Sequence, residues 1–105
     1  MLNQIVLVGR LTKNPEIINK NEKVVITLAI PRTYKNMNGE YETDFVDCIL
    51  WAGIATNTAE YCKKGDLVGV KGRIQTRQEN AKNIIEVVAE KVTFLSNRKE
   101  ESEEA

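Results

Sequence analysis

Short apolar runs and alternating apolar–polar positions, separated by turn residues, cover most of the chain. They predict five strands, at 5–11, 24–30, 43–51, 66–77 and 84–95. These segments are rich in β-branched residues and show the period-two pattern that is typical of strands. A short stretch at 16–18 is expected to resume the first strand after Asn14-Pro15, and Pro31 is expected to end the second. Asn38-Gly39 predicts a type I′ hairpin turn, whose two central residues need positive φ, and a polar connection is expected at 78–83.

One helix is predicted at 54–64, between the third and fourth strands. Ala55, Ala59 and Cys62 fall on one face of it at spacings of four and three residues. The helix is expected to end at Lys63-Lys64-Gly65, because cations favour the C-terminal end of the backbone dipole and glycine supplies a left-handed cap.

The order of three strands, one helix and two strands predicts an all-β fold, the five-stranded Greek-key barrel called the OB-fold, with its helix between strands 3 and 4. Glycines at 9, 69 and 72 lie inside strands, where a small barrel needs sharp bending. An open antiparallel sheet with a helix packed on one face, or another small barrel, fits the same order. Residues 1–96 are expected to form this single domain, and 97–105 a short acidic tail without fixed structure.

Composition excludes several classes of protein. The 105 residues suffice for one domain, and the 15 basic residues balance the 15 acidic ones. No stretch approaches the roughly 20 apolar residues of a membrane span, and the first residues lack the layout of a signal peptide, so a cytosolic protein is expected. The chain has no histidine, and Cys48 and Cys62 form no CxxC pair, so no metal or other cofactor is predicted. Since no nucleophile, P-loop or HExxH motif occurs either, the chain is not expected to be an enzyme.

The strand at 43–51 separates into two faces. Its even-numbered positions from 46 to 50 are apolar and predict a core face. The opposite face carries Phe45 and Trp51, about 20 Å apart, with Asp47 between them, and a carboxylate makes that face a poor core. Rings beside polar groups are what base stacking requires. Rings that cover the barrel, or pack under a loop or a partner subunit, would give the same pattern, and spacing alone leaves both interpretations open.

The fourth predicted strand carries Lys71, Arg73 and Arg77 on one face. Three cations in a row can follow the phosphates of a nucleic acid. A solvated face whose cations pair with cross-strand carboxylates such as Glu86 or Glu90 is the alternative. Further basic and aromatic candidates lie near strand ends and the hairpin: Arg10, Lys13, Arg32, Tyr34, Lys35 and Tyr41.

Four segments resemble bacterial single-stranded DNA-binding proteins: MLNQIVLVGRLTKNPE at 1–16, TDFVDCILW at 43–51, EYCKKG at 60–65 and VKGRIQTR at 70–77. The resemblance extends over about residues 1–95, in family order and spacing. It implies an OB-fold homotetramer, or a dimer, that binds single-stranded DNA with little sequence preference during replication, recombination and repair. In this family the first strand lies at the dimer interface. The residues implied for stacking and for phosphate contacts are Tyr34, Phe45, Trp51, Arg10, Lys71, Arg73 and Arg77.

Two departures from the family pattern change these expectations. Gln78-Glu79-Asn80 stands where the family usually has another aromatic residue, so a smaller site or weaker binding is predicted. The acidic segment at 100–105 has no large hydrophobic tip, so recruitment of replication and repair proteins through it is not expected. An OB-fold protein-interaction module with weak or no DNA binding therefore stays an alternative, as does RNA binding, since stacking does not discriminate between sugars.

Overall fold

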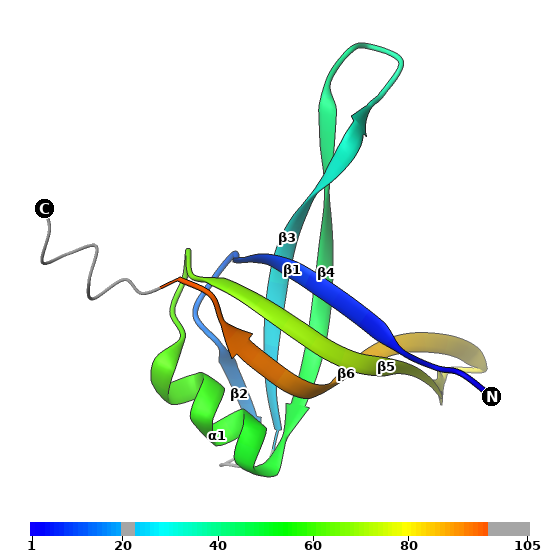
Figure 1. Ribbon diagram of the computed structural model, residues 1–105. Coiled ribbons are helices and arrows are strands. Elements are labelled where there is room, and N and C mark those ends of the chain that lie inside the picture. Colours follow the sequence, from blue (N-terminus) through cyan, green and yellow to red (C-terminus); the bar gives the residue numbers. More distant parts are fainter. Residues whose placement is uncertain (20–22, 97–105) are drawn as a thin grey trace, which may run out of the picture.

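The computed structural model describes residues 1–19 and 23–96, and the predicted tail at 97–105 lies outside them. The described residues form six strands and one helix (Figure 1). In chain order they are β1 (Ile5–Leu11), β2 (Glu16–Asn19), β3 (Lys23–Lys35), β4 (Tyr41–Trp51), α1 (Ala52–Tyr61), β5 (Leu67–Glu79) and β6 (Lys82–Phe94).

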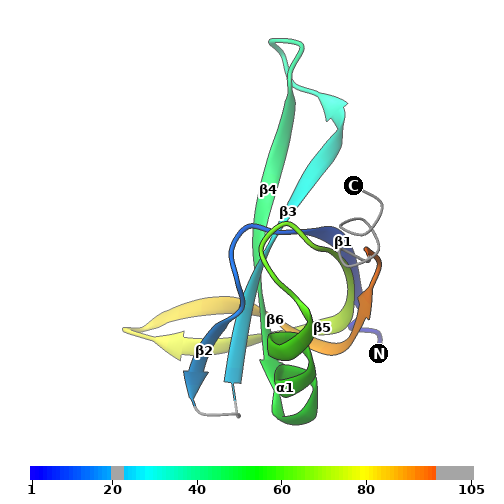
Figure 2. The ribbon, with the colours of Figure 1, turned by 90° about the vertical axis from the view of Figure 1, so that its left-hand side faces the viewer.

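The strands close into a barrel, seen nearly end-on with α1 below it in Figure 2. Its order is β1-β5-β6-β4-β3, and β1 returns to pair with β3 at Arg10↔Ala29 and Leu11↔Leu28. All neighbours are antiparallel except β4 and β6. Since β1 and β2 both pair with β3, they act as one barrel strand interrupted around Asn14-Pro15. The five-stranded OB-fold with its helix between the third and fourth barrel strands is thereby confirmed, and the open-sheet alternative is wrong.

Alternate residues of the strands fill the barrel, and α1 closes one end of it. Both cysteines lie in this core with free thiols. Burial raises the pKa of Cys48 to about 12 and that of Cys62 to about 11, which keeps both thiols protonated. Both residues therefore act as small hydrophobic side chains, as predicted. The buried residues of the core are Leu11, Val24, Ile26, Leu28, Cys48, Leu50, Ala55, Cys62, Val68, Val70, Val87 and Ala89.

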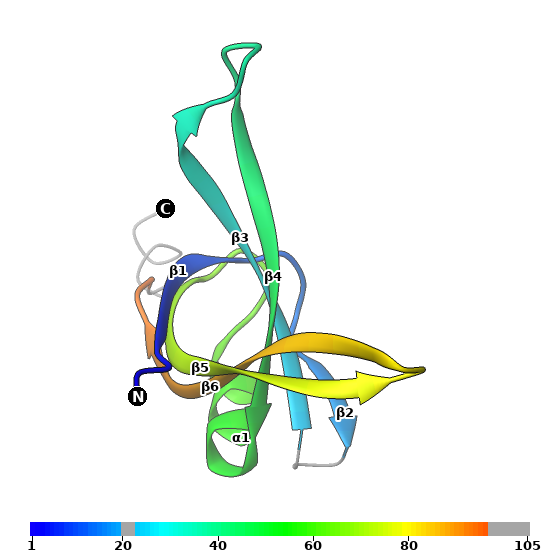
Figure 3. The same ribbon diagram turned by 90° about the vertical axis from the view of Figure 1, so that its right-hand side faces the viewer.

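Two hairpin arms leave the barrel, one formed by β3 and β4 and the other by β5 and β6 (Figures 1 and 3). The prediction that Pro31 ends its strand is wrong, because β3 continues to Lys35 and Pro31 pairs with Thr43. The pairings of β3 with β1 and β2 stop at Ala29, so beyond it only β4 pairs with β3. The carbonyl of Thr27 faces β1, where it accepts a hydrogen bond from the N–H of Thr12, and the direction of the backbone groups repeats every second residue. The nitrogen of Pro31 therefore faces away from β4, and its missing N–H removes no hydrogen bond from the sheet.

The turn of the β3–β4 arm lies where Asn38-Gly39 predicts it but is of another type. Gly39 has a φ of 79°, whereas Asn38 is not in the positive region. The side-chain oxygen of Asn36 accepts hydrogen bonds from the N–H groups of Asn38 and Glu40, each at 2.9 Å. These bonds close a three-residue loop that ends in a left-handed glycine, an alternative to the two-residue type I′ turn.

The type I′ turn occurs instead in the β5–β6 arm. Asn80 and Ala81 have φ values of 51° and 64°, and Glu79 pairs with Lys82 directly across them. The polar connection predicted at 78–83 is therefore wrong except for these two residues. The strong right-handed twist of a two-stranded arm favours a primed turn, even when one of its residues is alanine.

The helix begins and ends earlier than predicted, at Ala52 and Tyr61. The carboxylate of Asp66 accepts a hydrogen bond from the N–H of Lys63, and the N–H of Asp66 donates to the carbonyl of Lys63. This turn replaces the last helical turn, so Lys63 and Lys64 lie outside α1. Gly65 has the expected positive φ, 92°, but uses it within this turn and not as a helix cap.

Thr58 of α1 is fully buried, and its hydroxyl has no hydrogen-bond partner among the described residues. Thr58→Val keeps the shape and removes the unsatisfied group, so we expect the free energy of unfolding to rise by about 1 kcal/mol in urea denaturation. Thr56→Val is the matched control, because that hydroxyl is exposed and donates to the carbonyl of Ala52. A midpoint for Thr58→Val at or below that of the parent chain would contradict the assignment of a lone hydroxyl.

Candidate nucleic-acid interface

The outer face of β3 and β4 carries the two rings that the sequence singles out. Cross-strand pairs point to the same side of a sheet, so Ala29, Thr27 and Lys23 flank the outward residues of β4. The side chain of Phe45 is 67% exposed and that of Trp51 45%. The predicted division of β4 into a core face and an outward face is confirmed except at Ile49, which shares the outward side with the rings but is only 7% exposed. We call this outward surface the ring face; its residues are Lys23, Val25, Thr27 and Ala29 of β3 and Phe45, Asp47, Ile49 and Trp51 of β4.

Two predicted cations lie at the margins of the ring face. Arg10 of β1 pairs with Ala29, which in turn pairs with Phe45, so the three residues form one row across the outer surface. On the other side Arg73 joins the face through its pair with Val88 of β6, which pairs with β4. Neighbouring strands are about 5 Å apart, so each arginine lies two or three strands from a ring. The barrel thus brings cations from β1 and β5, far apart in the chain, to one surface.

Three of the predicted arginines form ion pairs with carboxylates: Arg32, Arg73 and Arg77. Arg77 donates hydrogen bonds to Glu86 and Glu79, both at 2.6 Å, and Arg73 lies 3.6 Å from Glu90. The hydrogen bonds from Arg77 lower the pKa of Glu86. The cross-strand partners named as the alternative are therefore present. Arg73, Arg77, Glu79 and Glu90 stay about half exposed, and exposed pairs are weak, whereas the side chain of Glu86 is only 12% exposed.

The β3–β4 arm shows the same arrangement. Arg32 donates to Asp44 at 2.9 Å and to Glu42 at 2.6 Å, and this hydrogen bonding lowers the pKa of Asp44. The ammonium group of Lys35 lies 5.8 Å from the centre of the Tyr41 ring, an arrangement typical of a cation–π contact. The predicted stacking residue Tyr34 is exposed on the same arm, near the end of β3.

Other predicted cations lie apart from the ring face. Lys71 pairs with Val6 of β1 on the outer surface of the β1–β5 pair. Lys13, in the connection after β1, lies 3.4 Å from Glu16. The structure therefore brings Arg10 and Arg73 to the margins of the ring face, where the guanidinium of Arg10 donates to the carbonyl of Gly65 at 3.0 Å, and leaves these two lysines elsewhere.

Lys23 is a ring-face cation that the sequence patterns did not reveal. Its ammonium group lies 5.4 Å from the centre of the Trp51 ring, and the two residues are cross-strand partners. A cation over a ring at this distance is well placed to meet the phosphate of a base stacked on that ring. Only the register of β3 against β4 could have indicated Lys23 in advance. That register depends on an irregularity between Pro31 and Lys35, which the sequence does not show.

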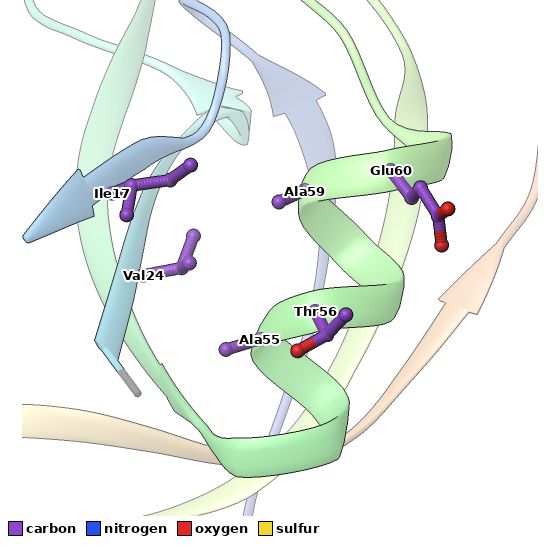
Figure 4. Close-up of a pocket in the computed structure, with 6 residues that line it drawn as sticks. All are labelled: Ile17, Val24, Ala55, Thr56, Ala59 and Glu60. Carbon is purple, nitrogen blue, oxygen red and sulfur yellow. The ribbon is translucent and has the colours of Figure 1, made fainter. Parts of the chain in front are cut away.

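A hollow of about 290 Å³ lies away from this surface, between α1 and the β2–β3 pair (Figure 4). Ile17, Val24, Ala55 and Ala59 make most of its lining apolar, and none of the described residues that line it is a lysine or arginine. It is therefore a poor site for a phosphate. Within residues 1–19 and 23–96, no cluster of side chains could hold a metal ion, and no helix has the length and apolar character needed to cross a membrane.

Fold and surface together define a class of protein: an OB-fold barrel, the scaffold whose strand faces and loops bind oligonucleotides or oligosaccharides. Residues 2–95 match the model of the Single-strand binding protein family, and the chain belongs to this family. The prediction that it is not an enzyme agrees with this membership.

Relatives support the assignment, and a solved structure matches the fold. The chain is 47% identical to "Single-stranded DNA-binding protein B" of Bacillus subtilis over 96% of both chains. It is 45% identical to the single-stranded DNA-binding protein of Halalkalibacterium halodurans over 98% of this chain, and spans 66% of that longer relative. A structure titled "Plasmodium falciparum SSB complex with ssDNA" matches the fold with a TM-score of 0.74 and 24% identity, over 91% of this chain and 96% of that one.

Proposed function

We propose that this chain binds and protects single-stranded DNA with little sequence preference, in the cytosol, during replication, recombination and repair. Bases stack on Tyr34, Phe45 and Trp51, and lysines and arginines around them neutralise phosphates. The named relatives are single-stranded DNA-binding proteins, and one of them matches this chain end to end, which supports the proposal.

The observation that carries the proposal is the exposure of two large rings on one strand face. Phe45 and Trp51 lie six residues apart, about 20 Å along β4, which leaves room for several bases between them. Each stacked base contributes about 1–3 kcal/mol without regard to its identity. Large rings left in water at this spacing are hard to explain by the stability of the barrel, because they are not part of its core.

The cations support the proposal in a second way. Lys23 lies on the ring face and Arg10 and Arg73 lie at its margins, so a DNA strand lying across the face meets positive charge along its path. Because these contacts displace condensed counterions, binding should weaken steeply as salt rises. The dependence is moderated by the carboxylate held near Arg73, which must be exchanged for a phosphate.

Association of several copies is part of the proposal, with a homotetramer expected. On β1, Ile5 and Leu7 pack against the core, while Val6 and Val8 point outward and are 65% and 49% exposed. A strand that is apolar on both sides suits an interface between copies. Several DNA-binding surfaces on one assembly would raise the affinity for a long strand without new contacts.

Trp51 is the only tryptophan in the chain, so its fluorescence reports directly on the ring face. We expect titration with a dT oligomer of about 35 nucleotides to quench it, with the midpoint moving to higher DNA concentration as salt is raised. Light scattering of the same samples gives the number of subunits with and without DNA. If the oligomer is retarded in a gel but the fluorescence of Trp51 does not change, the DNA binds on another surface.

A protein-interaction module is the second candidate, favoured by the carboxylates that already pair with Arg32, Arg73 and Arg77. It predicts no retention of the dT oligomer at micromolar protein and moderate salt. A gel-shift titration therefore separates the two functions.

A further inference from the structure

Asp47 is the one carboxylate on the ring face, and it lies between the two rings along β4. The hydroxyl of Thr27 donates a hydrogen bond to one of its oxygens, Oδ1, at 2.6 Å. Among the described residues no cation lies within ion-pair distance of Asp47, in contrast to Asp44, Glu86 and Glu90. The carboxylate is therefore held in place by a neutral donor and keeps its second oxygen as an acceptor.

A groove of about 260 Å³ opens beside Asp47, lined by residues of the ring face and of the β5–β6 arm. This volume equals that of about nine water molecules in the liquid, so the groove has room for a single nucleobase. Val25, Ile49 and Ile85 offer it apolar surface against which a flat ring can lie. Arg77 and Glu86, which also line it, bind each other, so Asp47 is the acceptor that the groove leaves open.

Lys23 connects this groove with Trp51. Its side chain lines the groove, and its ammonium group lies over the Trp51 ring. A DNA strand whose base stacks on Trp51 and whose phosphate meets Lys23 would carry a neighbouring base to the mouth of the groove. The groove is therefore continuous with the surface already proposed for DNA.

We infer that Asp47 is a specificity-determining residue, which makes the groove prefer cytosine, with its exocyclic amino group, to uracil and thymine. A carboxylate accepts a hydrogen bond from N4 of cytosine, the pairing expected for this base. Uracil and thymine present a carbonyl oxygen, O4, at that position, and two acceptors repel each other. The inference rests on the proposed function. It adds one base-selective position to a DNA-binding surface that otherwise has little sequence preference.

Oligomers of dC and dU isolate this difference, because the two bases differ only at position 4 and in the proton on N3. We expect the parent chain at pH 8, where cytosine is not protonated, to bind a short dC oligomer about three- to tenfold more tightly than the equal dU oligomer, the range that one net hydrogen bond gives. Asp47→Asn should bring this ratio close to one, because an amide can accept a hydrogen bond from N4 of cytosine and can donate one to O4 of uracil. Thr27→Val should lower the ratio in part, because it frees the carboxylate to turn.

Asp44→Asn is the matched control, since it removes the same charge from β4 at a carboxylate that Arg32 already holds. It should change the affinity for both oligomers alike and leave their ratio as in the parent chain. Equal binding of dC and dU by the parent chain, or a ratio that Asp47→Asn does not move, overturns the inference and leaves the proposed function intact. If neither oligomer binds, the proposed function itself has failed.

Discussion

Gly72→Ala will destabilise the barrel by about 3 kcal/mol or more, the upper end of what inserting a methyl group into a packed site costs. A Cβ atom at Gly72 would overlap the carbonyl oxygen of Val88 on the neighbouring strand. That carbonyl cannot retreat easily, because Val88 also pairs with Ile49 of β4 and an irregularity in the β5–β6 register lies next to it. Urea denaturation at one fixed protein concentration measures the loss.

Gly69→Ala is the control for this prediction. It lies on the same strand, but its Cβ would meet side-chain atoms of Leu95 and Thr93 only at 3.6 and 3.9 Å, ordinary contact distances. We expect its free energy of unfolding to stay within about 0.5 kcal/mol of that of the parent chain, as for most surface substitutions. Equal stability of the two variants would show that β6 has more freedom beside Gly72 than this packing allows.

Phe45→Ala and Trp51→Ala will each weaken the binding of a dT oligomer by about 1–3 kcal/mol, the contribution of one stacked base. Both side chains are largely exposed and lie outside the core, so the barrel and its subunit number should be unchanged. Gel-shift titration measures the affinity, because Trp51→Ala removes the fluorescent reporter. Urea denaturation and light scattering verify fold and assembly.

Tyr61→Ala serves as the control for loss of an exposed ring. Tyr61 lies at the end of α1 and packs against Phe94 with ring centres 6.1 Å apart, away from the ring face. Its removal should leave DNA binding unchanged. If Phe45→Ala or Trp51→Ala instead unfolds the domain, these rings serve the stability of the barrel and the proposed surface is wrong.

Much of the site can be predicted from β4 alone. Residues two apart in a strand share a face, so Phe45, Asp47 and Trp51 must lie together wherever the strand is placed. The cations could not be predicted in the same way. Arg10 and Arg73 reach this surface only because the barrel closes, and their partners depend on pairs between strands.

Lys23 shows why such pairs escape sequence analysis. Counting back from a two-residue turn at Asn38-Gly39 would place Trp51 opposite Ile26, a core residue. The longer loop and the irregularity between Pro31 and Lys35 shift the register, and Trp51 lies opposite Lys23 instead. A shift of this size is a small local event at the arm, but it decides whether a cation lies over the ring.

The sequence by itself determined the kind of elements, their order, the two faces of β4 and the family of the chain. These follow from the alternation of side chains along each strand, a property of one segment at a time. Only the tertiary structure decided the turn types, the end of the helix, which arginines are paired and that Asp47 borders a groove. Each of these depends on contacts between segments distant in the chain, where one carboxylate or one shifted pair selects among conformations of similar local energy.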